Sequence, residues 1–145
     1  MVRRTELLAA AARGLAGAMM MSALREVTLS LGLLRESPPD TMVREGTPAS
    51  VEEVGDGTRS AVTELAHWAY GAGGGAAYAL LPDALKVRGV SGPAYGLGVW
   101  LGFELLLAPL LGVRHPQGKV VGRAMLALDH VVYGVVVAGR FPPNR

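Results

Sequence analysis

Ionisable side chains interrupt the apolar stretches of this chain, and their types allow three kinds of chemistry. They can pair as a structural polar core, form a pathway for protons or a small solute, or ligate a metal ion. An ionisable group inside a bilayer costs about 2.5–3.5 kcal/mol on insertion scales, so we expect each one to face other helices. The residues concerned are Arg25, Glu26, Glu64, His67, Glu104, Asp129, His130 and Tyr133.

Opposite charges within this set favour the structural polar core. We expect Arg25 to be neutralised by Glu26 or Glu104, because an unpaired guanidinium is costly away from water. Tyrosine hydroxyl groups would complete such a network. We also expect Asp129 to pair with either His67 or Arg123.

Two histidines in apolar segments, His67 and His130, favour a pathway for protons or a small solute. Imidazole is the side chain that changes its charge near neutral pH. His130 and Tyr133 are three residues apart and therefore share one helix face. A proton-coupled or small-solute transporter is accordingly the alternative function.

A metal site of the di-iron carboxylate type is the third interpretation. Glu64 and His67 have the Glu-x-x-His spacing of bundles in which two other helices supply single glutamates. Ala127 stands where a second such motif needs its carboxylate. We therefore predict no cofactor, favour a protein that is not an enzyme, and keep a metal-dependent membrane enzyme as the second alternative. The candidate ligands are Glu26, Glu64, His67, Glu104 and His130.

Four apolar segments are long enough to hold these residues within a bilayer. A hydrocarbon core of about 30 Å takes roughly 20 helical residues. Short connections after the second and third segments make consecutive helices antiparallel, which predicts a single all-α domain, an up-down-up-down four-span transmembrane bundle. The segments are 14–34, 60–81, 90–113 and 120–141, and a polar loop, 36–59, joins the first two.

A soluble bundle is the alternative architecture, because every segment contains ionisable groups. A soluble helix should show a polar face at 3.6-residue spacing. Residues 105–111 and 131–138 show no such face. Half of the chain is hydrophobic and only 18% is charged. We therefore predict a multi-pass protein with the lipid bilayer as its surroundings.

Glycine is the most unusual feature of the composition, with 20 residues in 145. Small residues four apart let membrane helices pack closely. A run of three, Gly73 to Gly75, would weaken a soluble helix by about 1 kcal/mol per glycine. We predict that glycine faces pack the helices, and that the chain forms a homo-oligomer or joins a larger membrane complex. The glycines concerned are Gly14, Gly71, Gly75, Gly92, Gly96, Gly98 and Gly102.

The second and fourth segments share the pattern Leu-x-His-x-x-Tyr-Gly, at 65–71 and 128–134. This repetition indicates a possible duplicated helical hairpin. Near the chain start, Thr5 followed by Glu6 predicts an N-cap, so that the first helix begins before its apolar segment.

The charge distribution excludes some partners and orients the bundle. The 14 basic residues form no cluster, so we predict no nucleic-acid binding. The absence of cysteine excludes disulfide scaffolds and zinc–cysteine sites. Basic residues are almost balanced between the two ends of the bundle, and because long loops count little, we expect both termini in the cytoplasm.

Several features of the first 80 residues resemble a known group of proteins. A Gly-rich first segment contains Met19 to Met21 and Arg25, Pro38 and Pro39 follow it, and a second segment carries His67. These features resemble the small bacterial inner-membrane proteins of the YagU-like type. The resemblance implies a multi-span protein of the bacterial cytoplasmic membrane, and it supplies no catalytic residues. Independently of the resemblance, the glycine faces favour a binding, accessory or assembly role.

Overall fold

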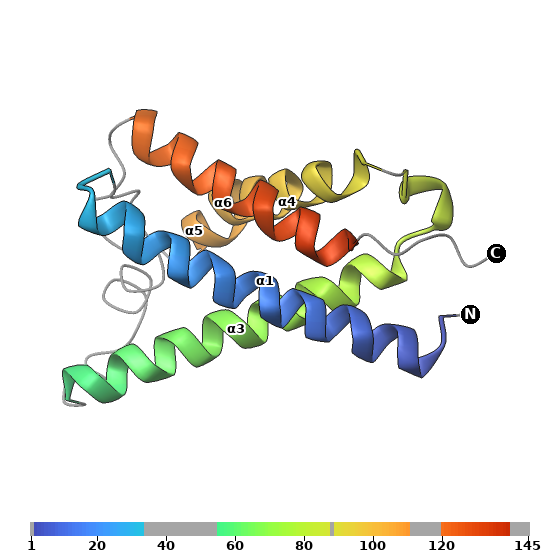
Figure 1. The fold of residues 1–145 in the computed structure, drawn as a ribbon, viewed down its shortest axis with the longest axis horizontal. Helices are drawn as coiled ribbons and strands as arrows, with labels where there is room; N and C mark the ends of the chain where they lie inside the picture. Colours follow the sequence, from blue (N-terminus) through green and yellow to red (C-terminus); the bar gives the residue numbers. More distant parts are fainter. Residues whose placement is uncertain (1, 34–54, 88, 111–119, 140–145) are drawn as a thin grey trace.

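The computed structural model describes residues 2–33, 55–87, 89–110 and 120–139, and within them the chain is all-helical (Figure 1). The two helices of the first half are α1, Arg4–Ser30, and α3, Asp56–Leu80. The second half contains α4, Ser91–Gly102, a π-helical segment η3, Phe103–Leu107, a short α5, Ala108–Leu110, and α6, Val120–Ala138. A 3-10 turn, η2, Asp83–Leu85, lies between the two halves.

Three stretches among the described residues are long and apolar enough to cross a membrane: Arg4–Ser30, Ser91–Leu110 and Val120–Ala138. The expected span at 60–81 lies in α3, which is 25 residues long but is not one of the three. The polar first turns of α3 and the Glu64 and His67 side chains dilute its apolar character. A fourth span is therefore still a prediction. The expected loop at 36–59 lies mostly outside the described residues, and its last four residues, 56–59, are helical, because α3 begins at Asp56.

The first helix begins earlier than its apolar segment, at Arg4. Glu6 accepts hydrogen bonds from the backbone N–H of Arg3 at 3.1 Å and from its guanidinium at 2.7 and 2.9 Å. Arg3 is thus the N-cap residue, and the Glu6 carboxylate accepts a hydrogen bond from its backbone N–H. The prediction that Thr5 caps the helix is wrong, because Thr5 already lies inside the helix. The helix ends at Ser30, and Gly32 follows with a φ of +67°.

A π-helical turn interrupts the third apolar stretch. Its hydrogen bond runs from the Ala108 N–H to the Phe103 carbonyl, five residues back. Pro109 follows, and its ring removes the N–H that would bond to Leu105 and crowds that carbonyl. We attribute the widened turn to this proline, and it places Glu104 on a segment with altered side-chain register.

The helices pack as two crossed pairs, α1 with α3 and α4 with α6, and contacts between α1 and α6 join the pairs (Figure 1). α3 touches α6 only sparsely. The buried hydrophobic cluster at the junction consists of Met21, Tyr78, Tyr133 and Val137.

Glycines lie at both crossings. A Cβ added to Gly14 would lie 2.8 Å from the Cα of Gly75, and Gly14 also abuts the Gly71 carbonyl. In the other pair, a Cβ added to Gly92 would lie 2.8 Å from the Gly134 carbonyl oxygen. No side chain fits between backbones at these distances, so both crossings require glycine.

Not every expected packing glycine lies at a crossing. Gly96 does, with the backbone of His130 and Gly134 against it. Gly98 and Gly102 have no atom of another described element within 4 Å of an added Cβ. These two therefore lie on the outer face of α4.

Candidate functional site

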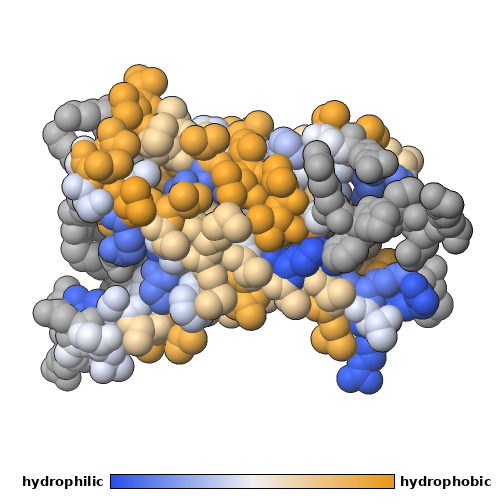
Figure 2. All heavy atoms as spheres, in the orientation of Figure 1, coloured by the Kyte–Doolittle hydropathy of each residue, from blue (hydrophilic) through white to orange (hydrophobic). Residues whose placement is uncertain are grey.

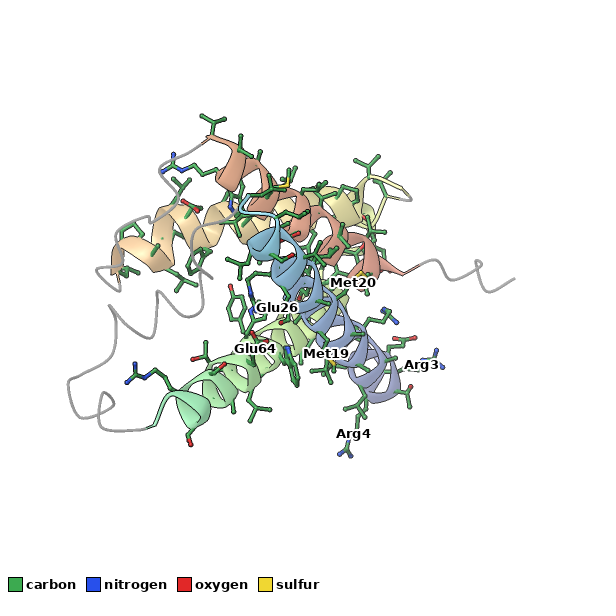
Figure 3. All side chains as sticks on the ribbon, turned by 60° about the vertical axis from the view of Figure 1, so that its left-hand side comes forward. Arg3, Arg4, Met19, Met20, Glu26 and Glu64 are labelled. Atoms are coloured by element: carbon green, nitrogen blue, oxygen red, sulfur yellow. The ribbon has the colours of Figure 1, made fainter. Side chains whose placement is uncertain are left out.

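An ion pair between Arg25 on α1 and Glu64 on α3 is the centre of the polar cluster. Figure 3 shows Glu64 on α3, on the side that faces α1. The Arg25 Nη2 donates to Glu64 Oε1, and the whole Arg25 residue is 4% exposed. The Glu64 side chain keeps 30% of its surface, in the angle where α1 and α3 diverge. The prediction of Glu26 or Glu104 as the partner of Arg25 is wrong. Glu26 follows Arg25 directly and is exposed, because adjacent residues point about 100° apart on a helix.

Two residues that the sequence analysis did not single out complete this ion pair. The Ser22 hydroxyl donates to Glu64 Oε2 at 2.6 Å and accepts from Arg25 Nη2 at 3.2 Å. Trp68 Nε1 donates to the same hydroxyl at 3.2 Å. Ser22 lies one turn before Arg25, and Trp68 lies one turn after Glu64. Such i,i+3 and i,i+4 spacing on the two helices is the signal that could have identified them.

Asp129, His67 and His130 are the other ionisable residues that the sequence placed in this cluster. Asp129, at the centre of α6, is 6% exposed. It interacts electrostatically with Arg25, and His67 does so with Arg25, Glu64 and His130. His130 Nδ1 lies 2.8 Å from the Leu126 carbonyl oxygen. Ionisable groups of α1, α3 and α6 thus lie in one region, where Arg25 and Glu64 are directly bonded.

The predicted pairing of Asp129 does not occur among the described residues. Neither His67 nor Arg123 forms a hydrogen bond or ion pair with it, and Arg123 is exposed near the start of α6. Within the same part of the chain, the Nε2 of His67 and the Nε of Arg25 are buried without a hydrogen-bond partner. Buried polar atoms of this kind are places where ordered water or a small polar ligand is retained.

Tyrosines tie this cluster to the glycine crossings. Tyr133, which we expected in the polar cluster, donates its hydroxyl to the Gly71 carbonyl at 2.7 Å. Tyr95 on α4 donates to the Gly74 carbonyl at 2.6 Å. A Cβ added to Gly74 would collide with the Tyr133 hydroxyl, so this glycine leaves the space in which the hydroxyl reaches the α3 backbone. The polar cluster therefore lies beside two hydrogen bonds that connect one helix pair to the other.

The candidate metal ligands are not gathered. Among the described residues, no group of three or more His, Asp or Glu side chains could hold a metal ion. Glu26 faces outward from α1, and Glu104 is half-buried on η3 with an interaction of its own. The expected set of Glu26, Glu64, His67, Glu104 and His130 thus does not converge as a di-metal site requires.

No protein-family model, curated protein or solved structure matches this chain. The resemblance to YagU-like proteins therefore stays a prediction. What the site can do follows from its geometry: it holds a charged pair at a helix divergence and isolates a carboxyl group and two imidazoles in the interior.

Proposed function

We propose that this chain is a four-span integral membrane protein with a binding or assembly role, built around an interior polar cluster. The proposal rests mainly on the distribution of side chains, which is the reverse of that in a water-soluble protein: charged residues are buried and large hydrophobic residues are exposed. Arg25 and Asp129 are buried, whereas Leu65, Leu105 and Leu110 are 61%, 69% and 81% exposed. Hydrophobic residues cover much of the face in Figure 2. Hydrocarbon solvates such a surface, and water does not.

The course of the helices supports the up-down-up-down arrangement. In Figure 1, α1 and α4 run towards one end of the molecule, and α3 and α6 run back. α3 then serves as the fourth span, with its Glu64 paired to Arg25 of α1. The location that we propose is the bacterial cytoplasmic membrane with both termini on the cytoplasmic side.

Membrane insertion is tested by extraction of membranes from expressing cells. We expect the full chain to stay in the pellet at alkaline pH and in high salt, and to be released by detergent. A peripheral protein would be released by either aqueous treatment, and that result would contradict the proposal.

The assembly role uses the outer face of α4. Gly71 and Gly75 are occupied by α1 within the chain, so they are not free to pack against a second copy. Gly98 and Gly102 are open, with Leu97 and Leu101 exposed beside them. We propose that this face meets a second copy or a larger membrane complex.

Light scattering of the detergent-solubilised protein tests this face. We expect Gly98→Leu or Gly102→Leu to reduce the oligomeric mass and Gly73→Leu, another open position on α3, to leave it unchanged. An unchanged mass in all three variants would argue against assembly through α4.

Asp129 favours transport as a second candidate function. A buried carboxyl group with no direct ionic partner among the described residues is suited to carry a proton. We expect liposomes containing the protein to show proton flux that Asp129→Asn abolishes. Glu26→Gln, at an exposed carboxylate, should retain it. Absence of flux in the unaltered protein excludes this candidate.

A further inference from the structure

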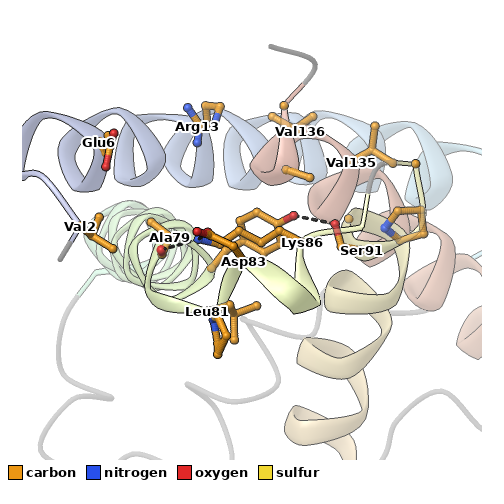
Figure 4. Close-up of a pocket in the computed structure, with 17 residues that line it drawn as sticks. Val2, Glu6, Arg13, Ala79, Leu81, Asp83, Lys86, Ser91, Val135 and Val136 are labelled. Atoms are coloured by element: carbon orange, nitrogen blue, oxygen red, sulfur yellow. Dashed lines mark hydrogen bonds and ion pairs between the residues drawn. The ribbon is translucent and has the colours of Figure 1, made fainter. Parts of the chain in front are cut away.

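An open pocket of about 1420 Å³ lies at the end of the molecule where α1 begins and α6 ends (Figure 4). α1, α3, η2, α4 and α6 all contribute to its walls. Small-ligand pockets have roughly 300–1,000 Å³. This pocket is therefore large enough for a polar headgroup together with part of an attached chain.

Two cations are fixed in the pocket wall by the ends of helices. Arg13 Nε donates to the Val137 carbonyl at 2.9 Å, in the last turn of α6. Lys86 Nζ donates to the Ala79 carbonyl at 2.9 Å, in the last turn of α3. These bonds satisfy carbonyl groups that the helices leave open, and they hold both positive charges at the pocket.

The acidic residues of the pocket are more exposed than the cations. Asp83 bonds to Lys86 at 3.3 Å, but its side chain is 100% exposed, whereas that of Lys86 is 25% exposed. The Glu6 side chain is 48% exposed and already paired with Arg3. Water and salt screen exposed charges most strongly. The interior of the pocket therefore has a positive character, although the formal charges of its walls balance.

The rest of the lining is largely apolar. Val135, Val136 and Ala138 border the pocket from α6, and Leu81 and Pro82 border it from the chain after α3. The Tyr78 hydroxyl and the Ser91 hydroxyl are 2.7 Å apart and join α3 to the start of α4 in the lining. Positive charge beside an apolar wall, at the end of membrane-spanning helices, matches an anionic amphiphile.

We propose that this pocket binds the phosphate headgroup of an anionic membrane phospholipid, with the adjoining acyl chain against the α6 wall. Arg13 and Lys86 contact the phosphate, and Asp83 weakens the attraction from the rim. The inference rests on the proposed insertion in a membrane, which places this pocket at the boundary between hydrocarbon and water.

Titration of the purified full chain in a neutral detergent with short-chain phosphatidylglycerol, followed by native mass spectrometry, tests the proposal. We expect Lys86→Gln and Arg13→Gln each to weaken binding about fivefold, the effect of one basic residue near anionic lipid. Arg4→Gln removes an exposed charge at the same end that does not line the pocket, and it should leave binding unchanged. Asp83→Asn should strengthen binding.

The outcomes separate the possible ligands. An equal loss in Arg4→Gln, or no response to Lys86→Gln and Asp83→Asn, overturns the site even if Arg13→Gln fails to fold. Competition by inorganic phosphate at equal concentration would identify free phosphate as the ligand and overturn the lipid assignment. Release of the protein from membranes without detergent defeats the proposed function, whereas lost lipid binding in an inserted protein defeats this inference alone.

Discussion

In each of the two helix pairs, α1 with α3 and α4 with α6, the helices cross at glycines, but the side chains around the two crossings differ. Gly14 meets Gly71 and Gly75 in the first pair, and Gly134 meets Gly92 and Gly96 in the second. The glycine that ends each Leu-x-His-x-x-Tyr-Gly sequence, Gly71 or Gly134, therefore lies at a crossing. This correspondence supports the proposed duplication of a helical hairpin.

The tyrosines of the same repeated sequence show how the pairs differ. Tyr133 is 3% exposed and bonds to the first pair, whereas Tyr70 is 52% exposed. In the first pair, the polar contact lies away from the glycine crossing, where Arg25 on α1 and Glu64 on α3 join the diverging helices. The glycines therefore determine where the helices of each pair cross, and the neighbouring side chains determine which polar contacts each pair makes.

The largest destabilisation is expected from a side chain placed at a glycine crossing. Gly14→Leu and Gly96→Leu place a side chain where backbone atoms now lie, so we expect each to destabilise the protein by more than about 3 kcal/mol or to prevent folding. Thermal unfolding in detergent, followed by circular dichroism, measures this loss.

Gly73→Leu is the matched control, because an added Cβ meets nothing there within 4 Å. It should change stability by less than about 1 kcal/mol, since leucine also has the better helix propensity. If Gly14→Leu destabilises the protein strongly and Gly96→Leu only mildly, the two glycine crossings do not contribute equally to stability.

A smaller loss is expected from removing one partner of the ion pair. Glu64→Ala leaves the buried Arg25 without its carboxylate, so we expect a cost of about 2–3 kcal/mol, below the 3–5 kcal/mol of a fully buried pair because Glu64 is partly exposed. The double variant Arg25→Met with Glu64→Met should recover much of that cost, as apolar pairs often replace buried ion pairs.

Glu26→Ala provides the reference for removing a carboxylate from the same region. Glu26 is exposed, so a change within about 0.5 kcal/mol is expected. An equal loss in Glu26→Ala and Glu64→Ala, measured by unfolding in the same detergent, would mean that the pair is not the stabilising element.

The sequence predicted the helices well and the partners poorly. Apolar length and glycine spacing are local properties, so the helical class, three apolar spans and the polar residues could be read from them. Which carboxylate meets Arg25 depends on where α1 and α3 cross and diverge, and this is set by Gly14 against Gly71. The predicted partners were Glu26 or Glu104, but the helix turns Glu26 away from the face that carries Arg25.

The smallest expected effect tests the repeated sequence directly. Tyr133→Phe removes a buried hydrogen bond to the Gly71 carbonyl, which keeps its helical partner, so we expect a loss of about 1 kcal/mol. Tyr70→Phe, at the corresponding exposed position, should be neutral when both are compared by thermal unfolding. Equal effects would show that the tyrosines have the same role in both pairs. A loss of stability only in Tyr133→Phe would mean that both copies of the motif place a glycine at a helix crossing, while only the second copy contributes a hydrogen bond between the two pairs.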